Sequence, residues 1–543
     1  MPFGNMTNAL YYGDNLDVLR NSIAADSVDL VYLDPPFNSK QDYNLLFKSP
    51  KGHASEAQIQ AFKDSWHWDY QAEREFDELM RQPNTNLAEL MRTLRAFLGM
   101  NDMLAYLTMM ANRLLELHRA LKSAGSLYLH CDPTASHYLK IVLDAVFGKE
   151  NFQNEIIWKR TNAHNFKTKG YVRAHDTIFY YTKTRRFIFN EQHTEYSSAQ
   201  MSRFRPDENG RLYTARDMTF STANPSRQFE WRGTKPPKNR SWGYSLEKLE
   251  QLFSEGRILL KKDGTPRMDG LKVYLDETKG APLTTNWTDI ERVGNTSDER
   301  LGYPTQKPLA LLERIISVSS NPGDVVLDPF CGCGTAVHAA QKLKRRWLGI
   351  DITHLAISLI EKRIKDAFGA RAKFEIIGTP KDAEAARDLA RRDKYQFQWW
   401  AVSLVDAQPS QGKKKGADGG IDGIKYFRDL DQKGARKLIV SVKGGDNLKA
   451  DDVRSLMAVR ERENAEIAVM ISLAEPTAGM RGDAASAGFY ESANGKKFPR
   501  VQLLTVTGLL EGREHAGHPD FLPNMNYKQA GEEATTSQMV MEV

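Results

Sequence analysis

The sequence predicts an α/β fold in which mostly parallel strands alternate with helices. Three observations support this prediction. Apolar, strand-like runs alternate with segments of helical periodicity over residues 1–158, and the same alternation resumes near Leu301. In the second stretch a glycine-rich turn at 328–335 joins a buried strand to a helix, as phosphate- and nucleotide-binding α/β proteins require.

In the first stretch, the apolar run VDLVYL at 28–33 predicts a buried strand. Pro35 and Pro36 follow it and end the strand, because proline cannot donate a ladder hydrogen bond. Residues 102–122 have the periodicity of a long amphipathic helix, which ends near Gly125 and leads into another strand.

In the second stretch, the predicted elements follow one another without long loops. They are a helix at 308–320, a strand at 324–330, a helix at 335–344, a strand at 346–352 and a helix at 354–368.

The chain of 543 residues is long enough for two or three domains. We divide it into an α/β segment at 1–158, a loop-rich basic segment at 159–300, a second α/β segment at 301–373, a further α/β region at 374–520 and a tail at 521–543. The polar composition of the tail predicts disorder.

Composition limits the class of protein. Hydrophobic residues make up 41% and charged residues 27%, as in globular proteins, and no apolar run reaches the ~20 residues of a membrane helix. Cys131, Cys331 and Cys333 are too few for a disulfide framework, and no secretory signal opens the chain. We expect a cytoplasmic protein without a membrane partner.

The net charge of +6 is unevenly distributed. Residues 159–240 hold 17 Lys or Arg against 7 Asp or Glu, with aromatic residues between them. Cations attract phosphates and aromatic rings stack on bases, so this composition suits a nucleic-acid-binding surface. A solvated, charged face is the alternative.

The turn DPFCGCGT at 328–335 predicts a cofactor site. Glycines let a ligand approach the backbone, and the following helix offers free N–H groups. Asp351 ends the next strand, where an acid can accept hydrogen bonds from ribose hydroxyls. The cofactor should therefore contain a nucleoside, and the turn lacks the G-x-G-x-x-G pattern of nicotinamide-binding proteins.

These motifs together resemble those of DNA amino-methyltransferases of the β group. The tetrapeptide DPPF at 34–37 matches the family's catalytic signature, GDN at 13–15 and YPTQKP at 303–308 match two further motifs, and DPFCGCGT matches the S-adenosylmethionine turn. The catalytic half comes first in the chain, the basic insertion follows it, and the cofactor half comes last. This is the permuted motif order of that group. The resemblance covers about residues 8–370.

The resemblance implies a Rossmann-like S-adenosylmethionine-dependent methyltransferase fold. It implies that the catalytic residues are Asp34, Pro35, Pro36 and Phe37. It implies that the cofactor is held by Asp14, Lys307, Pro308, Asp328, Pro329, Phe330, Gly332, Gly334, Thr335 and Asp351. Asp14 would hold the adenine amino group of the cofactor, although a helix N-cap is an alternative role for it.

Asp34 in the first position of the signature leans towards adenine-N6 as the methylated atom, with cytosine-N4 as the alternative. The family's signature is shared by RNA methyltransferases, but the basic insertion favours double-stranded DNA. Methylation of cytosine carbon-5 is excluded, because it uses a Pro-Cys pair and no proline precedes any of the three cysteines.

The basic segment would read the target sequence through the major groove. Candidate readers are Arg173, Arg203, Arg205, Arg216 and Arg232. A second copy of the chain and a cognate restriction endonuclease are open as protein partners.

The region 374–520 resembles Mrr-like restriction endonucleases. Asp422 and, about twenty residues later, Lys443 match an acid and a lysine that in that family hold magnesium at a phosphate. Ser441 stands where the family usually has an acid or glutamine, which weakens the expected metal site. The alternatives are therefore a bifunctional restriction–modification protein and a DNA-binding or packing appendage.

Overall fold

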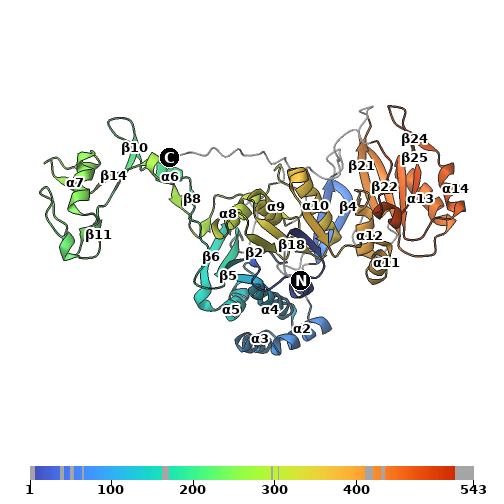
Figure 1. Ribbon diagram of the computed structural model, residues 1–543, viewed down its shortest axis with the longest axis horizontal. Coiled ribbons are helices and arrows are strands. Elements are labelled where there is room, and N and C mark those ends of the chain that lie inside the picture. Colours follow the sequence, from blue (N-terminus) through green and yellow to red (C-terminus); the bar gives the residue numbers. More distant parts are fainter. Residues whose placement is uncertain are drawn as a thin grey trace. The chain divides into compact units, whose positions relative to one another are not determined.

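The computed structural model describes residues 7–36, 42–48, 54–63, 67–161, 170–294, 297–301, 303, 305–409, 420–429 and 435–519 (Figure 1). It separates into two compact units. The first comprises 1–190 and 285–543, and the second is Glu191–Thr284.

Nine strands of the first unit form one sheet. In spatial order they are β16 (Asn286–Trp287), β6 (Phe152–Lys159), β7 (His175–Thr182), β5 (Leu121–Cys131), β2 (Val28–Leu33), β17 (Val325–Asp328), β18 (Arg346–Asp351), β1 (Asn8–Tyr12) and β19 (Phe374–Ile377).

The centre of this sheet is parallel and joins the two predicted α/β segments. β2 pairs in parallel with β17, with Leu30 opposite Val326. β2 belongs to the first predicted α/β segment and β17 to the second, so the two segments share one sheet. β18 and β1 continue the parallel run on one side, whereas β7 runs antiparallel to both β5 and β6. The carboxyl ends of β1, β2, β17 and β18 therefore meet at one edge.

Helices cover both faces of the sheet (Figure 1). Because side chains alternate along a strand, Val31 packs with the cluster that contains α1 (Asn15–Ser22), α4 (Asp102–Ala120) and α5 (Ser136–Phe147). Leu30 packs on the opposite face with α8 (Leu309–Ser319), α9 (Thr335–Lys342) and α10 (His354–Phe368). This two-sided burial accounts for the continuous apolar run of β2.

The first unit contains further elements before the C-terminal region. They are the antiparallel pair β3 (Asp42–Lys48) and β4 (Ala54–Lys63), the helices α2 (Tyr70–Met80) and α3 (Thr85–Leu98), and the short turns η1 (Lys149–Asn151) and η4 (Gly369–Arg371). No helix within the described ranges is long and apolar enough to cross a bilayer.

The second unit is shorter than the predicted segment 159–300. β6 and β7 pair with each other and β16 extends their sheet, so the residues on either side of Glu191–Thr284 belong to the first unit. The second unit is built of short pieces around Trp231 and Trp242, which are buried.

The elements of the second unit are short. They are β8 (His193–Thr194), α6 (Ser198–Met201), β9 (Arg205–Pro206), β10 (Leu212–Arg216), β11 (Thr219–Phe220), η2 (Pro225–Arg227), β12 (Ser241–Trp242), α7 (Leu246–Ser254), β13 (Ile258–Leu260), β14 (Pro266–Tyr274), η3 (Leu275–Glu277) and β15 (Ala281–Pro282).

The C-terminal region has its own five-stranded sheet, in the order β20 (Gln408–Pro409), β21 (Gly423–Arg428), β22 (Ala435–Lys443), β23 (Ile467–Ser472) and β26 (Val501–Thr505). The first three strands are antiparallel and the last two run parallel to β22. This region begins after β19, because β19 pairs with β1 and completes the first sheet. The predicted tail 521–543 lies outside the described residues.

The other elements of the C-terminal region surround this sheet. They are α11 (Ala383–Arg392), α12 (Lys394–Ser403), α13 (Ala450–Arg462), α14 (Ala478–Ser486), the pair β24 (Phe489–Glu491) and β25 (Lys497–Pro499), and α15 (Val506–Leu510).

Candidate functional site

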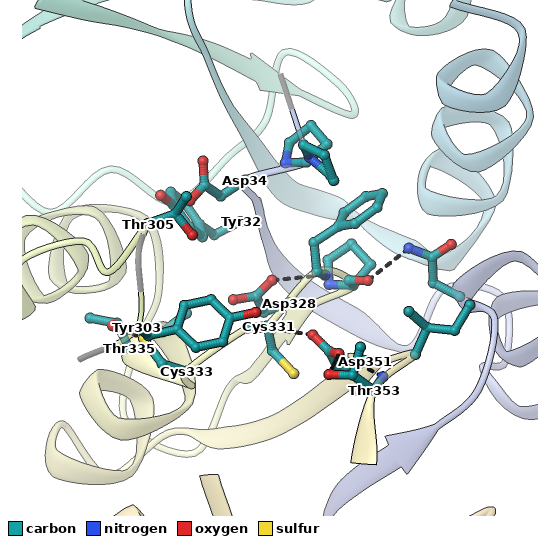
Figure 2. Close-up of a pocket in the computed structure, with 18 of the residues that line it drawn as sticks. Tyr32, Asp34, Tyr303, Thr305, Asp328, Cys331, Cys333, Thr335, Asp351 and Thr353 are labelled. Carbon is teal, nitrogen blue, oxygen red and sulfur yellow. Dashed lines mark hydrogen bonds between the residues drawn. The ribbon is translucent and has the colours of Figure 1, made fainter. Parts of the chain in front are cut away.

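A cavity of about 360 Å³ lies at the carboxyl ends of β1, β2, β17 and β18. Each of these strands supplies one acid to its wall, namely Asp14, Asp34, Asp328 and Asp351. Figure 2 shows three of them, with Asp328 between Asp34 and Asp351 in that view. A cavity of this size lies within the range of cofactor sites in proteins.

Asp34 stands directly after β2, and Pro35 and Pro36 follow it in the cavity wall. Its Oδ2 atom accepts a hydrogen bond of 2.5 Å from Lys307 Nζ. Its Oδ1 atom is buried and has no hydrogen-bond partner among the described residues. Since buried polar atoms are normally satisfied, this oxygen points to a ligand that donates a hydrogen bond. Phe37 lies outside the described residues.

The glycine-rich turn follows β17 and leads into α9. Gly332 and Gly334 have positive φ angles of 50° and 74°, which other residues rarely adopt. A Cβ atom on Gly334 would lie 2.7 Å from Ile360 Cγ1, and one on Gly332 would lie 3.2 Å from Tyr303 Cε1. The turn therefore needs glycine for both backbone conformation and space.

Asp351 is fixed by three hydrogen bonds. Its Oδ2 atom accepts from Gly332 N at 2.9 Å, and its Oδ1 atom accepts from the backbone N and the hydroxyl of Thr353, both at 2.9 Å. Burial raises the pKa of Asp351 to about 6, although these bonds favour the carboxylate. The acid that was predicted to hold a ribose is thus rigid and lies beside the turn.

Asp328 is the innermost acid of the cavity. Burial raises its pKa well above the usual value, and the nearby charges of Asp34 and Asp351 act in the same direction. A hydrogen bond from Phe330 N to Asp328 Oδ1 opposes this rise only in part. The surroundings of the Asp328 carboxyl therefore favour its neutral form over the carboxylate.

Asp14 has two structural partners. Its Oδ1 atom caps α1 by accepting from Leu16 N at 2.8 Å, so the alternative N-cap role is present. Both of its carboxylate oxygens also accept from Arg113 Nη2 at 3.1 Å. Arg113 comes from α4, is buried, and donates to Asn15 Oδ1 as well. The cavity is thereby lined by a fixed acid–arginine pair.

The other predicted cofactor residues divide into two groups. Lys307, Pro329, Phe330 and Thr335 line the cavity, whereas Pro308 and Gly334 are not among its described lining residues. Sequence reasoning missed several lining residues: Tyr32, Met109, Arg113, Tyr303, Gln396 and Trp399. Two of them had a signal in the sequence: Tyr303 opens the motif YPTQKP, and Arg113 is a charged residue within the apolar helix MMANRLLEL.

The predicted base readers are all exposed: Arg173, Arg203, Arg205, Arg216 and Arg232. Arg232 is committed to an ion pair with Glu250 at 2.8 Å and lies over the Phe253 ring. Arg205 lies over the Tyr213 ring. Arg173 precedes the second unit rather than belonging to it.

In the C-terminal sheet, Asp422 and Lys443 lie close together in space. Asp422 Oδ2 accepts a 2.6 Å hydrogen bond from Val442 N, which precedes Lys443. The Lys443 amine forms an ion pair with Asp452 at 3.0 Å. Within the described ranges no three His, Cys, Asp or Glu side chains gather as a metal site.

Comparison with known proteins gives a family match and several relatives. The sequence model of the DNA methylase family N6_N4_Mtase matches residues 28–362. The type II methyltransferase M.EcaI of Enterobacter cloacae is 33% identical over 297 residues, which are 54% of this chain and 65% of that protein. The StyLTI Mod subunit, a type III restriction-modification enzyme of Salmonella typhimurium, is 27% identical over 355 residues, 62% of this chain and 50% of that protein.

A solved structure of a DNA modification methylase from Thermus thermophilus, complexed with S-adenosyl-L-methionine, is 17% identical. The match covers 68% of this chain and 99% of that protein, with a TM-score of 0.32. The chain spans 50–65% of the length of the two curated relatives above. The family match ends before the C-terminal sheet.

Proposed function

The chain belongs to the N6/N4 DNA methylase family, and from this membership we propose that it transfers a methyl group from S-adenosylmethionine to an exocyclic amino group of a base in DNA. The observation that carries the proposal is the buried, unpartnered Oδ1 atom of Asp34, a residue that lines a cavity bordered by the glycine turn and Asp351.

The residues of the cavity fit this cofactor. The backbone of Gly332 lines the cavity, and the Asp351 carboxylate lies beside it as the candidate acceptor for ribose hydroxyls. Asp14 is the candidate for the adenine amino group, and its pairing with Arg113 fixes the carboxylate in place. When bound, the cofactor supplies a methyl group on a positively charged sulfur, an electrophile that needs no further activation.

The amino group of a base is a weak nucleophile, because its lone pair is delocalised into the ring. Asp34 Oδ1 can accept one N–H of that group, and the Pro35 carbonyl is the candidate for the other, so that the lone pair becomes available. Lys307 holds the opposite oxygen of Asp34 and keeps the carboxylate in one orientation. The base nitrogen loses one proton when it is methylated, and we assign Asp34 as the acceptor of that proton. Catalysis otherwise rests on the alignment of the amino group with the methyl group of the cofactor.

The target base must leave the duplex to reach the cavity. Phe37 is the candidate stacking partner for the extruded base, on the strength of the family signature alone. We propose adenine-N6 as the methylated atom, because aspartate occupies the first position of that signature. Cytosine-N4 is the alternative, since its amino group presents the same two N–H bonds to Asp34.

We propose double-stranded DNA as the substrate and Glu191–Thr284 as the unit that reads its sequence, on the basis of the unit's exposed arginines. The relatives named as restriction–modification subunits make a cognate restriction endonuclease a candidate partner.

One experiment tests the reaction and its base. The purified chain is incubated with labelled S-adenosylmethionine and duplex DNA, and the digested nucleosides are separated by liquid chromatography and mass spectrometry. N6-methyldeoxyadenosine is the expected product. If N4-methyldeoxycytidine is found instead, the methylated base is cytosine and not adenine. Incorporation of label into structured RNA but not into DNA would contradict the proposed substrate.

A second candidate function, DNA cleavage by the C-terminal region, has one observation in its favour. The Asp422–Val442 hydrogen bond holds an acid beside Lys443, as a nuclease site of the predicted kind would require. Ser441 and the Lys443–Asp452 ion pair argue against cleavage, since the first removes a metal ligand and the second neutralises the lysine. Supercoiled plasmid with magnesium should remain uncut, whereas cutting by wild type and not by Lys443→Ala would establish the nuclease.

A further inference from the structure

The helix α12 contributes to two structures at once. It belongs to the C-terminal region, where Phe397, Trp400 and Ala401 pack in the core beneath the five-stranded sheet. Another face of α12 contacts α10, a helix that packs on the first sheet. Figure 1 shows α12 at the start of the C-terminal region, next to α11. Residues three to four positions apart lie on the same face of a helix, so Phe397, Trp400 and Ala401 share one face. Gln396 and Trp399, which are three positions apart, share another.

Trp399 lies on the face that meets the first sheet. It is 8% exposed and packs in a small cluster with Tyr303, Cys333, Leu355 and Leu359. Tyr303 belongs to the motif YPTQKP and Cys333 to the glycine-rich turn. Both residues line the cavity, and so does Trp399. A large aromatic side chain from outside the family match thus forms part of the wall.

Gln396 lies one turn before Trp399 and also lines the cavity. Its Oε1 atom accepts from His354 N at 3.3 Å, at the first residue of α10. The preceding residue, Thr353, donates to the carboxylate of Asp351. The amide nitrogen of Gln396 donates to none of the described residues, so it can serve a ligand beside Asp351.

We propose that α12 is part of the cofactor site, with Trp399 as an aromatic wall and Gln396 as an amide donor. This inference rests on the proposed function, since it assigns these residues to S-adenosylmethionine. A flat indole offers a stacking and apolar surface to the nucleoside or the thioether end of such a ligand. Because the other face of α12 is core, cofactor binding and the packing of the C-terminal region are coupled.

The test is calorimetric titration of the full-length chain with S-adenosylhomocysteine. Trp399→Ala should weaken binding by about 10-fold or more, as expected for loss of a stacking side chain. Gln396→Ala should weaken it to a smaller extent. Gln398→Ala is the matched control, because it changes the same helix at a position that does not line the cavity, and it should bind as wild type does.

The outcomes separate the two proposals. If the wild-type chain binds S-adenosylhomocysteine and Trp399→Ala binds it with the same affinity, the proposed role of α12 is wrong. The methyltransferase proposal would still stand. If Trp399→Ala does not fold, Trp399→Leu, which removes the aromatic ring and keeps the bulk, and Gln396→Ala decide, and wild-type affinity in both would likewise overturn the role of α12. Absence of binding by the wild-type chain would remove the proposed function, and this inference with it.

A second measurement tests the coupling. Hydrogen–deuterium exchange should show slower exchange in α12 and β22 when S-adenosylhomocysteine binds, because both share the core of the C-terminal region. Protection confined to the glycine turn and β18 would contradict the coupling.

Discussion

Lys307 Nζ lies 2.5 Å from Asp34 Oδ2, and this contact joins two residues that are 273 positions apart in the chain. Both side chains are largely buried, with exposures of 10% and 15%. One carboxylate oxygen is thus held by a cation, and the other is left for a ligand. The contact links the two α/β segments of the sequence, 1–158 and 301–373, in the wall of the cavity.

Asp34→Asn should lower the rate of methyl transfer by about 100-fold or more, because an amide is a poorer proton acceptor than a carboxylate. Cofactor affinity should change little, since Asp34 is placed toward the base. The measurements are single-turnover transfer to DNA and calorimetric titration. Asp17→Asn, an exposed position on α1, is the control. Transfer at the wild-type rate by Asp34→Asn would refute the catalytic assignment.

Lys307→Met should destabilise the first unit by about 3 kcal/mol, because it leaves the buried Asp34 carboxylate without its counter-charge. The double variant with Asp34→Asn should recover part of that loss. A double-mutant cycle followed by thermal unfolding measures the coupling. Additive effects of the two substitutions would show that the pair contributes no mutual stabilisation.

Cofactor affinity should fall as the pH is lowered through about 6. Asp351 has a pKa of about 6 in the folded protein, so the carboxylate that we propose as the acceptor for ribose hydroxyls becomes a neutral acid below this pH. Binding that requires the ionised form then weakens by up to about 10-fold per pH unit. Titration with S-adenosylhomocysteine between pH 5 and 8 checks this. Asp351→Asn should bind weakly at every pH, and a pH dependence equal to wild type in that variant would point to another group.

Gly334→Ala should be more damaging than Gly323→Ala. Both positions have positive φ, but an added Cβ atom at Gly334 would meet Ile360 at 2.7 Å, whereas the space around Gly323 is open. We expect about 1 kcal/mol from the backbone conformation alone and about 1–3 kcal/mol more from overpacking at Gly334. Thermal unfolding of the two variants measures the difference. Equal melting temperatures would mean that Ile360 moves aside without cost.

The strand ends were the most predictable part of the site. Asp34, the glycine turn and Asp351 each follow an apolar run, and parallel strands bring their carboxyl ends to one edge. Local sequence therefore sufficed to group them. The match of the family model to residues 28–362 confirms the methylase family that the motifs implied.

The partners of these residues could not be predicted in the same way. Arg113 reaches Asp14 from α4, and Trp399 reaches the turn from the C-terminal region. Such contacts depend on how helices pack over the sheet, for which the sequence carries no local pattern. The compact unit Glu191–Thr284 is narrower than the predicted segment 159–300, since β7 pairs with β5, a contact between residues distant in the sequence.

The pairing of β2 with β17 also has a consequence for synthesis of the chain. Leu30 lies opposite Val326, which leaves the ribosome 296 residues later. At about 5–20 residues per second, translation exposes one edge of β2 for roughly 15–60 s before its neighbour exists. An apolar strand with an open edge is a site of aggregation. Slowing of translation within Glu191–Thr284 should therefore lower the soluble yield, and chaperones that mask nascent strands should restore it.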